Sequence, residues 1–318
     1  MNNLRVSSSP HIRSEATTQR IMLDVLIALI PTTVAGVVIF GMRALAVVLV
    51  CVAASVLSEF VFNLVVKKEQ TVTDFSAAVT GLLLGLNMHS QAPIWQCVIG
   101  SVFAIIVVKC LFGGLGCNFA NPAIAGRVFL LICFSGTLAG GAVPVIGGEA
   151  GTELVTGATP LAALSKIAEG GTAELPSLLD MFIGIKSGAI GEVCGLALII
   201  GFLYLVIRRV INPEAPVIFV ATVFLFILAF TNDVNAALYH VLSGGLLIGA
   251  IFMATDYVTT PITRSGKMVF AFGAGLITVL IRHFGNYPEG VSFAILFMNV
   301  ISPYIEKWTM NKPLGGSK

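Results

Sequence analysis

The sequence predicts an all-α integral membrane protein with about ten transmembrane helices in two inverted five-helix repeats, some of the helices short or broken. Three observations lead to this fold class. The chain of 318 residues is 57% hydrophobic and only 11% charged, which leaves too little polar surface for a soluble globule of this length. Its apolar residues fall into ten runs close to membrane length. Short glycine-containing motifs recur at matching places in two sets of five runs.

Eight of the ten runs have the length and composition of ordinary membrane helices. They are Ile21–Phe40, Ala44–Val66, Pro93–Phe112, Ala189–Ile207, Pro216–Phe230, Ala237–Thr255, Met268–Ile281 and Val291–Ile305. The other two runs, Asp74–Met88 and Asn121–Gly136, are shorter and bounded by Gly, Asn and Pro. These boundaries predict helices that are tilted, broken or partly re-entrant.

The chain begins with a polar arm, residues 1–20, which contains Arg5, Arg13 and Arg20. It lacks a short apolar core ending in a small-residue cleavage site, so we expect no removable signal peptide. The predicted organisation then comprises a first five-span repeat (21–136), a long loop (137–187), a second five-span repeat (188–305) and a C-terminal tail (306–318).

The distribution of Lys and Arg predicts the orientation of the chain. When the N-terminus is placed in the cytoplasm, ten crossings put 14 of the 18 basic residues on the cytoplasmic side. This bias is typical of multi-pass proteins of the cell (inner) membrane. Both termini are therefore expected to be cytoplasmic, and the loop 137–187 is expected to be extracytoplasmic.

Two internal similarities favour the inverted repeat. The segment Thr80–Gly85 of the third run resembles Gly244–Gly249 of the eighth, and Asn121-Pro122 in the fifth run resembles Asn286-Tyr-Pro288 at the tenth. Five is an odd number, so the second set enters the membrane from the opposite side, as in many transporters. The alternative is chance recurrence of small residues, which are common at contacts between membrane helices.

The long loop contains a polar turn whose threonine can be modified. In the segment Glu153–Leu161, the hydroxyl of Thr159 is expected to be accessible to solvent. A threonine needs an activating base to act as a nucleophile, and the loop contains no histidine for that role. A self-contained hydrolase is therefore not expected, whereas modification of this threonine by a separate enzyme is open.

The segment Thr156-Gly-Ala-Thr159 resembles the signature at which flavin transferases attach FMN through a phosphoester to the last threonine. With three further stretches, it makes nearly the whole chain similar to the D subunit of the Rnf complex and to its relative, the B subunit of the sodium-pumping NADH:quinone reductase. The three stretches are Ser8–Arg13, Gly113–Arg127 and Phe252–Thr263.

The resemblance implies that Thr159 carries a covalent FMN and that Thr156, Gly157 and Ala158 form the turn recognised by the transferase. It also implies a membrane subunit of a redox-driven ion pump, which relays electrons between ferredoxin and NAD with translocation of sodium or protons. Such a subunit is part of an oxidoreductase and is not catalytic alone. The chain departs from the common family pattern at Glu153 and Leu161, and the acidic character of the first position is retained.

The partners implied by the resemblance are a flavin transferase, a flavin-bearing G-type subunit, iron–sulfur B- and C-type subunits, and membrane A- and E-type subunits. The chain has no GxGxxG motif for NAD and no cysteine spacing typical of an iron–sulfur cluster. We expect no resident metal and no binding of nucleic acid.

A second, noncovalent flavin such as riboflavin is a further implication of the resemblance, and an ion path is another use of polar residues within the membrane. The candidate residues are Asn121, Pro122, Arg127 and Glu59, which lie near a broken helix or deep in an apolar run. For Asp74 and Asp256, at the ends of their runs, helix capping or ion pairing is the simpler expectation.

Two alternatives remain open from the sequence. The chain resembles a B-type subunit of a sodium-pumping NADH:quinone reductase less closely than an Rnf D subunit, since it has a shorter N-terminal arm and the segment Thr159-Pro160-Leu161. In a different functional class, an inverted five-span repeat also suits a channel or carrier for a small polar solute.

Overall fold

The computed structural model describes residues 17–138, 141–142, 144, 156–157, 159–168, 171–173, 175–285 and 289–310. Within these residues the regular structure is helical apart from two short strands, which confirms the all-α fold class. All ten apolar runs form helices. In chain order these are α1 (Thr18–Phe40), α2 (Met42–Val66), α3 (Ser76–Leu86), α4 (Ile94–Val102) with the π-helix η2 (Phe103–Cys110), α5 (Pro122–Cys133), α9 (Gly195–Ile207), α10 (Glu214–Thr231), α11 (Val234–Leu242) with α12 (Leu246–Ile248) and the π-helix η3 (Gly249–Met253), α13 (Arg264–Phe284) and α14 (Val291–Thr309).

The helices differ in whether they can cross a membrane alone. In the described part of the chain, α1, α2, α10 and α13 are long and apolar enough to do so, and α11 with α12 and η3 forms a fifth, bent span. The helices α3, α5 and α9, and α4 with η2, are apolar but shorter. The short third and fifth helices agree with the sequence prediction. The run Ala189–Ile207 was predicted to be ordinary, but its helix begins only at Gly195.

The run Ala237–Thr255 was also predicted to be an ordinary membrane helix, and this prediction is wrong. The helical direction changes by 65° between α11 and the α12–η3 segment. Gly244 lies at this break with a φ of 64°, a left-handed conformation that glycine adopts without steric cost. The glycine pair therefore ends one half-helix and allows the next to start in a new direction.

The recurring glycine motif has a different structural role in each half. In α3, a Cβ atom at Gly81 would lie 2.7 Å from the carbonyl oxygen of Cys51, and one at Gly85 would lie 3.0 Å from the Cα atom of Val48. Both of these neighbours belong to α2, so small residues let the two backbones approach closely. In the second half, the same motif begins with Gly244, at the position of Thr80, and this glycine lies at the helix break.

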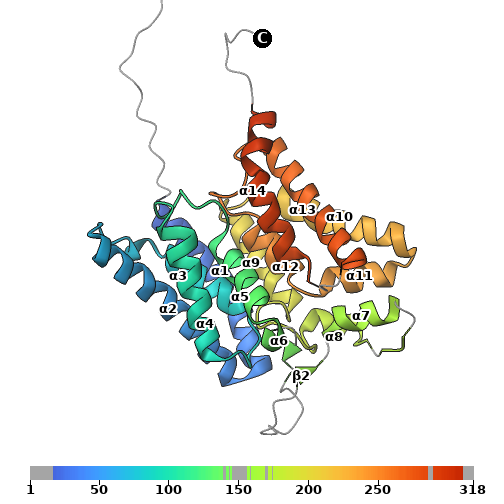
Figure 1. Ribbon diagram of the computed structural model, residues 1–318. Coiled ribbons are helices and arrows are strands. Elements are labelled where there is room, and N and C mark those ends of the chain that lie inside the picture. Colours follow the sequence, from blue (N-terminus) through green and yellow to red (C-terminus); the bar gives the residue numbers. More distant parts are fainter. Residues whose placement is uncertain are drawn as a thin grey trace, which may run out of the picture.

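The remaining elements lie on one side of the molecule, at the bottom of Figure 1. They are α6 (Ser135–Leu138), β1 (Gly141–Ala142), β2 (Thr156–Gly157), α7 (Pro160–Ala168) and α8 (Leu178–Ile183). We call this the loop side, and we call the opposite side, where α1 begins and α14 ends, the termini side. The short 3-10 helix η1 (Val72–Asp74) lies next to α3 on the termini side.

Helices at matching ordinal positions pack in a similar way in the two halves. In the first half α2 packs against α3 and α4, and in the second half α10 packs against α11 and α13. The two halves meet where α1 packs against α9 and α5 against α14. The division into inverted repeats stays a prediction, and one of its supports, Asn286-Tyr-Pro288, lies outside the described residues.

Candidate functional site

The predicted attachment turn is tied to the helical body by backbone pairing. Strand β2, which contains Thr156 and Gly157, pairs antiparallel with Gly141 and Ala142 of β1. Ala142 in turn forms a bridge to Gly188, in the connection that leads to α9. This pairing holds the turn against the loop side of the molecule. Ala158 lies outside the described residues.

Thr159 caps the N-terminus of α7. Its Oγ1 accepts a hydrogen bond from the backbone N–H of Ala162 at 3.3 Å, and its carbonyl oxygen accepts from the N–H of Ala163 at 3.0 Å. Pro160 is the first helical residue, a position where its missing N–H has no cost. The hydroxyl therefore lies beside the free N–H groups at the positive end of a helix, which favour a negatively charged group.

Thr159 also lines a pocket on the loop side, about 370 Å³ including its open mouth, and we call this the loop-side pocket. Its other lining residues are Asn87, Met88, His89, Arg127, Leu131, Leu138, Gly188, Ala189 and Glu289. Arg127 donates from Nη1 to the carbonyl oxygen of Asn87 at 2.9 Å, and its Nη2 forms an ion pair with Glu289. Its Nε has no partner, although the side chain is buried.

His89 is the second polar side chain in the wall of the loop-side pocket. Its Nε2 lies 2.8 Å from the carbonyl oxygen of Thr137, and its buried Nδ1 has no partner. Burial lowers the pKa of His89, and the positive charge of Arg127 adds to that effect. A helix N-terminus, an unpaired guanidinium N–H and an imidazole together suit a phosphate group, so the residues present fit an FMN phosphoester on Thr159.

Further buried charges stabilise the helix break next to this pocket. Arg282 donates to the carbonyl oxygens of His240 at 2.6 Å and Ser243 at 3.1 Å, and Lys186 donates to that of Leu242. These carbonyls end α11, where no helical N–H is available to them. Glu192 accepts from the N–H of Ala189 at 3.0 Å. In broken helices of transporters, free backbone carbonyls of this kind can bind sodium. In this chain the side chains of Arg282 and Lys186 bind to them instead.

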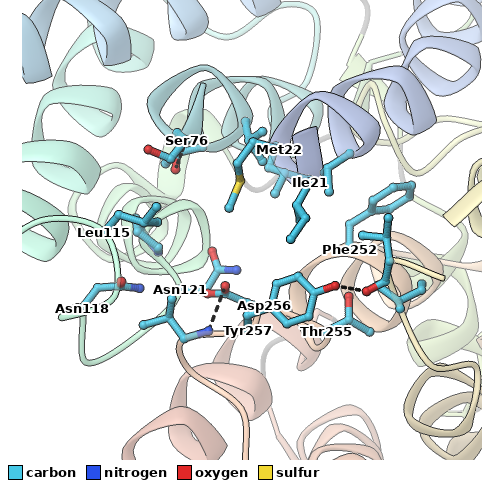
Figure 2. A pocket seen from close by; sticks show the side chains of 18 of the residues that line it. Ile21, Met22, Ser76, Leu115, Asn118, Asn121, Phe252, Thr255, Asp256 and Tyr257 are labelled. Carbon is cyan, nitrogen blue, oxygen red and sulfur yellow. Dashed lines mark hydrogen bonds between the residues drawn. The ribbon is translucent and has the colours of Figure 1, made fainter. Parts of the chain in front are cut away.

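A second pocket, the termini-side pocket, encloses about 750 Å³, including its open mouth. Asn121 and Pro122 line it from the start of α5, Ser76 from α3, and Asp256 from the connection after η3. Figure 2 shows Met22, Ser76 and Asn121 around the same space, with Asp256 nearby.

The polar residues of the termini-side pocket already have partners. Asn121 accepts hydrogen bonds from the N–H groups of Ala123 and Ile124 and so caps α5. Asp256 accepts from the N–H of Val258 at 3.4 Å and from the hydroxyl of Thr259 at 3.1 Å. These contacts close a turn between η3 and α13, so Asp256 does not cap a helix as expected.

Glu59 does not line either of these pockets. It forms an ion pair with Lys109 at 2.8 Å, with both side chains 2% exposed, and it accepts from the hydroxyl of Thr71 at 2.8 Å. The amino group of Lys109 also donates to Ser76 at 2.6 Å. Asp74 accepts from the N–H of Ser76 at 2.8 Å, which confirms its expected capping role. Lys109 reaches the wall of the termini-side pocket, but its charge is committed to Glu59.

The predicted site residues therefore fall into three places. Thr156, Gly157, Thr159 and Arg127 gather on the loop side, whereas Asn121 and Pro122 line the other pocket and Glu59 lies behind it. The sequence analysis grouped Arg127 with Asn121, but the two residues line different pockets. Each residue of α5 adds about 1.5 Å along the helix axis, and this separates their side chains.

Two titratable side chains of the loop-side pocket, those of His89 and Glu289, were not predicted. His89 follows the short third helix and Glu289 precedes the tenth, so both lie at helix ends that are distant in the sequence. The one signal pointing to them is their position beside the boundaries of short or broken runs.

Comparison with known proteins identifies the family of this chain. The NQR2, RnfD, RnfE family matches residues 5–315. The chain is 47% identical to the D subunit of the Na(+)-translocating ferredoxin:NAD(+) oxidoreductase complex of Acetobacterium woodii, over 99% of this chain and 96% of that protein. It is 40% identical to the D subunit of the proton-translocating ferredoxin:NAD(+) oxidoreductase complex of Clostridium ljungdahlii, over 99% and 97%. It is 34% identical to the D subunit of the ion-translocating oxidoreductase complex of Escherichia coli SE11, over 99% of both chains. The chain therefore belongs to the NQR2, RnfD, RnfE family.

Proposed function

We propose that this chain is the D-type membrane subunit of an ion-translocating ferredoxin:NAD oxidoreductase and carries FMN as a phosphoester on Thr159. One observation carries the proposal. Thr159 presents its hydroxyl at the N-terminus of α7, beside a pocket walled by Arg127 and His89, in a chain whose relatives bear the name of that subunit. A separate flavin transferase attaches the FMN in this proposal, because Thr156–Thr159 resembles the signature that such enzymes modify.

The flavin supplies the electron-carrying chemistry, and the protein supplies its placement. The turn Thr156–Ala158 gives the transferase access to Thr159, and the strand pairing of β2 keeps the linked group at the loop side. In this proposal the loop side faces the outside of the cell membrane and both termini face the cytoplasm, as the distribution of basic residues predicts. Ferredoxin and NAD are then served by other subunits.

The termini-side pocket suits a second, noncovalent flavin. Its wall combines apolar side chains with the amides of Asn118 and Asn121, and its cation, Lys109, is already paired with Glu59. Such a site favours a neutral ligand over a phosphorylated one, so riboflavin fits it better than FMN does. Electrons passing between the two flavins would cross the protein along α3 and α5.

The translocated ion is sodium or a proton, and the relatives from Acetobacterium woodii and Clostridium ljungdahlii differ in this respect. Glu59 remains a candidate for the ion path, with Lys109 as the residue that compensates its charge. A D-type subunit is favoured over a B-type quinone reductase subunit for two reasons. Both relatives are named as D subunits, and the similarity covers nearly their whole length.

The test is flavin fluorescence of the denatured chain in a gel, after co-expression with a flavin transferase. The expected result is a fluorescent band for the natural sequence and none for Thr159→Val. Thr172→Val is the matched control, because this threonine lies on the same loop but does not line the loop-side pocket. A natural chain without fluorescence would contradict the proposal and favour a channel or carrier.

A further inference from the structure

The loop-side pocket contains two buried polar atoms without a partner. Arg127 is 5% exposed and His89 is 7% exposed, yet Arg127 Nε and His89 Nδ1 have no hydrogen bond. Buried polar groups are almost always satisfied in folded proteins. Both atoms belong to side chains that line the same pocket as Thr159. A group bound there could satisfy both.

The guanidinium of Arg127 is held in a fixed orientation. Its Nη1 donates to the backbone carbonyl and side chain of Asn87, and its Nη2 pairs with Glu289. Because a guanidinium is a rigid plane, these two contacts fix the direction of the remaining Nε–H. A lysine at this position could keep the pairing with Glu289 but would have no second, fixed donor.

The buried cations near Thr159 outnumber by one the carboxylates that they interact with. Among the described residues on the loop side, the buried cations Arg127, Lys186 and Arg282 interact with the two carboxylates of Glu192 and Glu289. A phosphodiester carries a single negative charge. It therefore matches the excess and adds the favourable interaction with the N-terminus of α7.

We propose that Arg127 binds and positions the phosphodiester that joins the flavin to Thr159, with its Nε–H donating to a non-bridging phosphate oxygen. His89 forms the second wall of this phosphate site. Its Nε2 donates to the carbonyl oxygen of Thr137, so Nδ1 can also donate only when the ring is charged, a form that a neighbouring phosphate favours. This inference rests on the proposed function, in which Thr159 carries FMN.

The phosphate site restrains the flavin at its link to the protein. Without this site, the phosphate is tethered only through the Thr159 side chain, and the redox group samples a wider volume. With it, the position of the redox group relative to the helical body is set by α5, which carries Arg127. Arg127 is thus assigned to the covalent flavin and separated from the termini-side pocket.

The test is a thermodynamic cycle on the full chain in lipid nanodiscs. The natural chain and Arg127→Lys are each prepared with and without co-expressed flavin transferase, and intact mass establishes the presence of FMN. Thermal unfolding is then measured for all four forms. Flavin attachment is expected to raise the Tm of the natural chain by roughly 3 °C, and this gain is expected to fall by at least two thirds in Arg127→Lys.

Arg282→Lys is the matched control, because this buried arginine lies on the same side but does not line the loop-side pocket. Its gain in Tm on flavin attachment should equal that of the natural chain. If Arg127→Lys does not fold, His89→Gln replaces it, with an expected loss of about half the gain. An equal gain in the natural chain and in the variant would overturn the inference while leaving the flavin on Thr159. A natural chain without FMN would instead overturn the proposed function.

Discussion

The two pockets of this molecule differ in whether their polar groups already have hydrogen-bond or ion-pair partners. In the loop-side pocket, Arg127 and His89 keep buried atoms without partners, and Thr159 offers its hydroxyl at a helix N-terminus. In the termini-side pocket, Lys109 is committed to Glu59 and Ser76, and Asn121 caps its own helix. The first pocket has unpaired donors for a charged group, whereas the second has mainly apolar walls and satisfied polar groups.

This difference indicates which ligand each pocket can hold. An anion is stabilised where donors and helix dipoles are free, and it is disfavoured where the cation is already neutralised. This contrast is the basis for proposing the covalent phosphoester on the loop side and a neutral flavin on the termini side. Four predictions test this contrast, from the largest expected effect to the smallest.

The largest effect is expected from variants that remove one ligand and keep the other. Thr159→Val should abolish covalent flavin but leave the flavin that acid extracts from the folded chain. Leu115→Trp, which fills the termini-side pocket from a half-exposed position, should lower extractable flavin at least tenfold and leave covalent flavin unchanged. Acid extraction followed by in-gel fluorescence measures both pools. Loss of both pools in either variant would mean that the two sites are not separate.

The second prediction tests whether Lys109 is a structural cation. Lys109→Met leaves the buried Glu59 carboxylate without its counter-charge, with only the Thr71 hydroxyl as a partner, and we expect a loss of about 3–5 kcal/mol in the free energy of unfolding. The double variant Glu59→Met with Lys109→Met should recover most of that loss, because it removes both charges. Denaturant unfolding in detergent measures the two values. A stable Lys109→Met chain with less extractable flavin would instead indicate that Lys109 binds the ligand.

The third prediction concerns the buried positive charge on the loop side. Burial lowers the pKa of Lys186 from 10.5 to about 8. Between these two values the unfolded chain binds a proton that the folded chain has released, so stability rises with pH across this window. The rise is up to about 3 kcal/mol in this one group. Thermal unfolding between pH 7.5 and 10.5 should show it, and Lys186→Met should flatten the profile. An equal dependence of Tm on pH in the natural chain and in Lys186→Met would show that another group causes the effect.

The smallest effect is expected from the helix caps. Asp74→Ala removes the carboxylate that accepts from Ser76 at the start of α3, and Asp233→Ala removes the equivalent contact to Asn235 at the start of α11. Each should cost about 1 kcal/mol. Asp74→Ala should also lower extractable flavin, because Ser76 lines the termini-side pocket, whereas Asp233→Ala should not. An equal effect of both variants on extractable flavin would show that the cap does not shape that pocket.

Much of the fold could be predicted because membrane helices are strongly apolar segments with polar ends. The ten runs all became helices, and the short runs were recognisable from their Gly, Asn and Pro boundaries. The break in the eighth run was missed, because Gly244-Gly245 repeats a motif that packs two helices together in the first half. Whether a glycine pair allows close packing or ends a helix depends on its neighbours, and here Arg282 and Lys186 cap the freed carbonyls.

The site was predictable only in part. Thr159 was predicted from its local motif, but the residues around it come from four distant segments of the chain. The loop-side pocket brings together His89, Arg127 and Glu289. The first two lie in or beside helices too short to cross the membrane fully, whose ends lie at a similar depth. The sequence placed Arg127 beside Asn121, its neighbour in the chain, although the two face different pockets. Proximity along a helix does not define a shared site.

The most direct test of the account is mass analysis of the chain purified from cells that contain a flavin transferase. The account predicts that the intact chain is heavier by one FMN less one water, and that the added mass lies on the single peptide containing Thr159. An unmodified Thr159, or an FMN found on a different residue, would contradict the account.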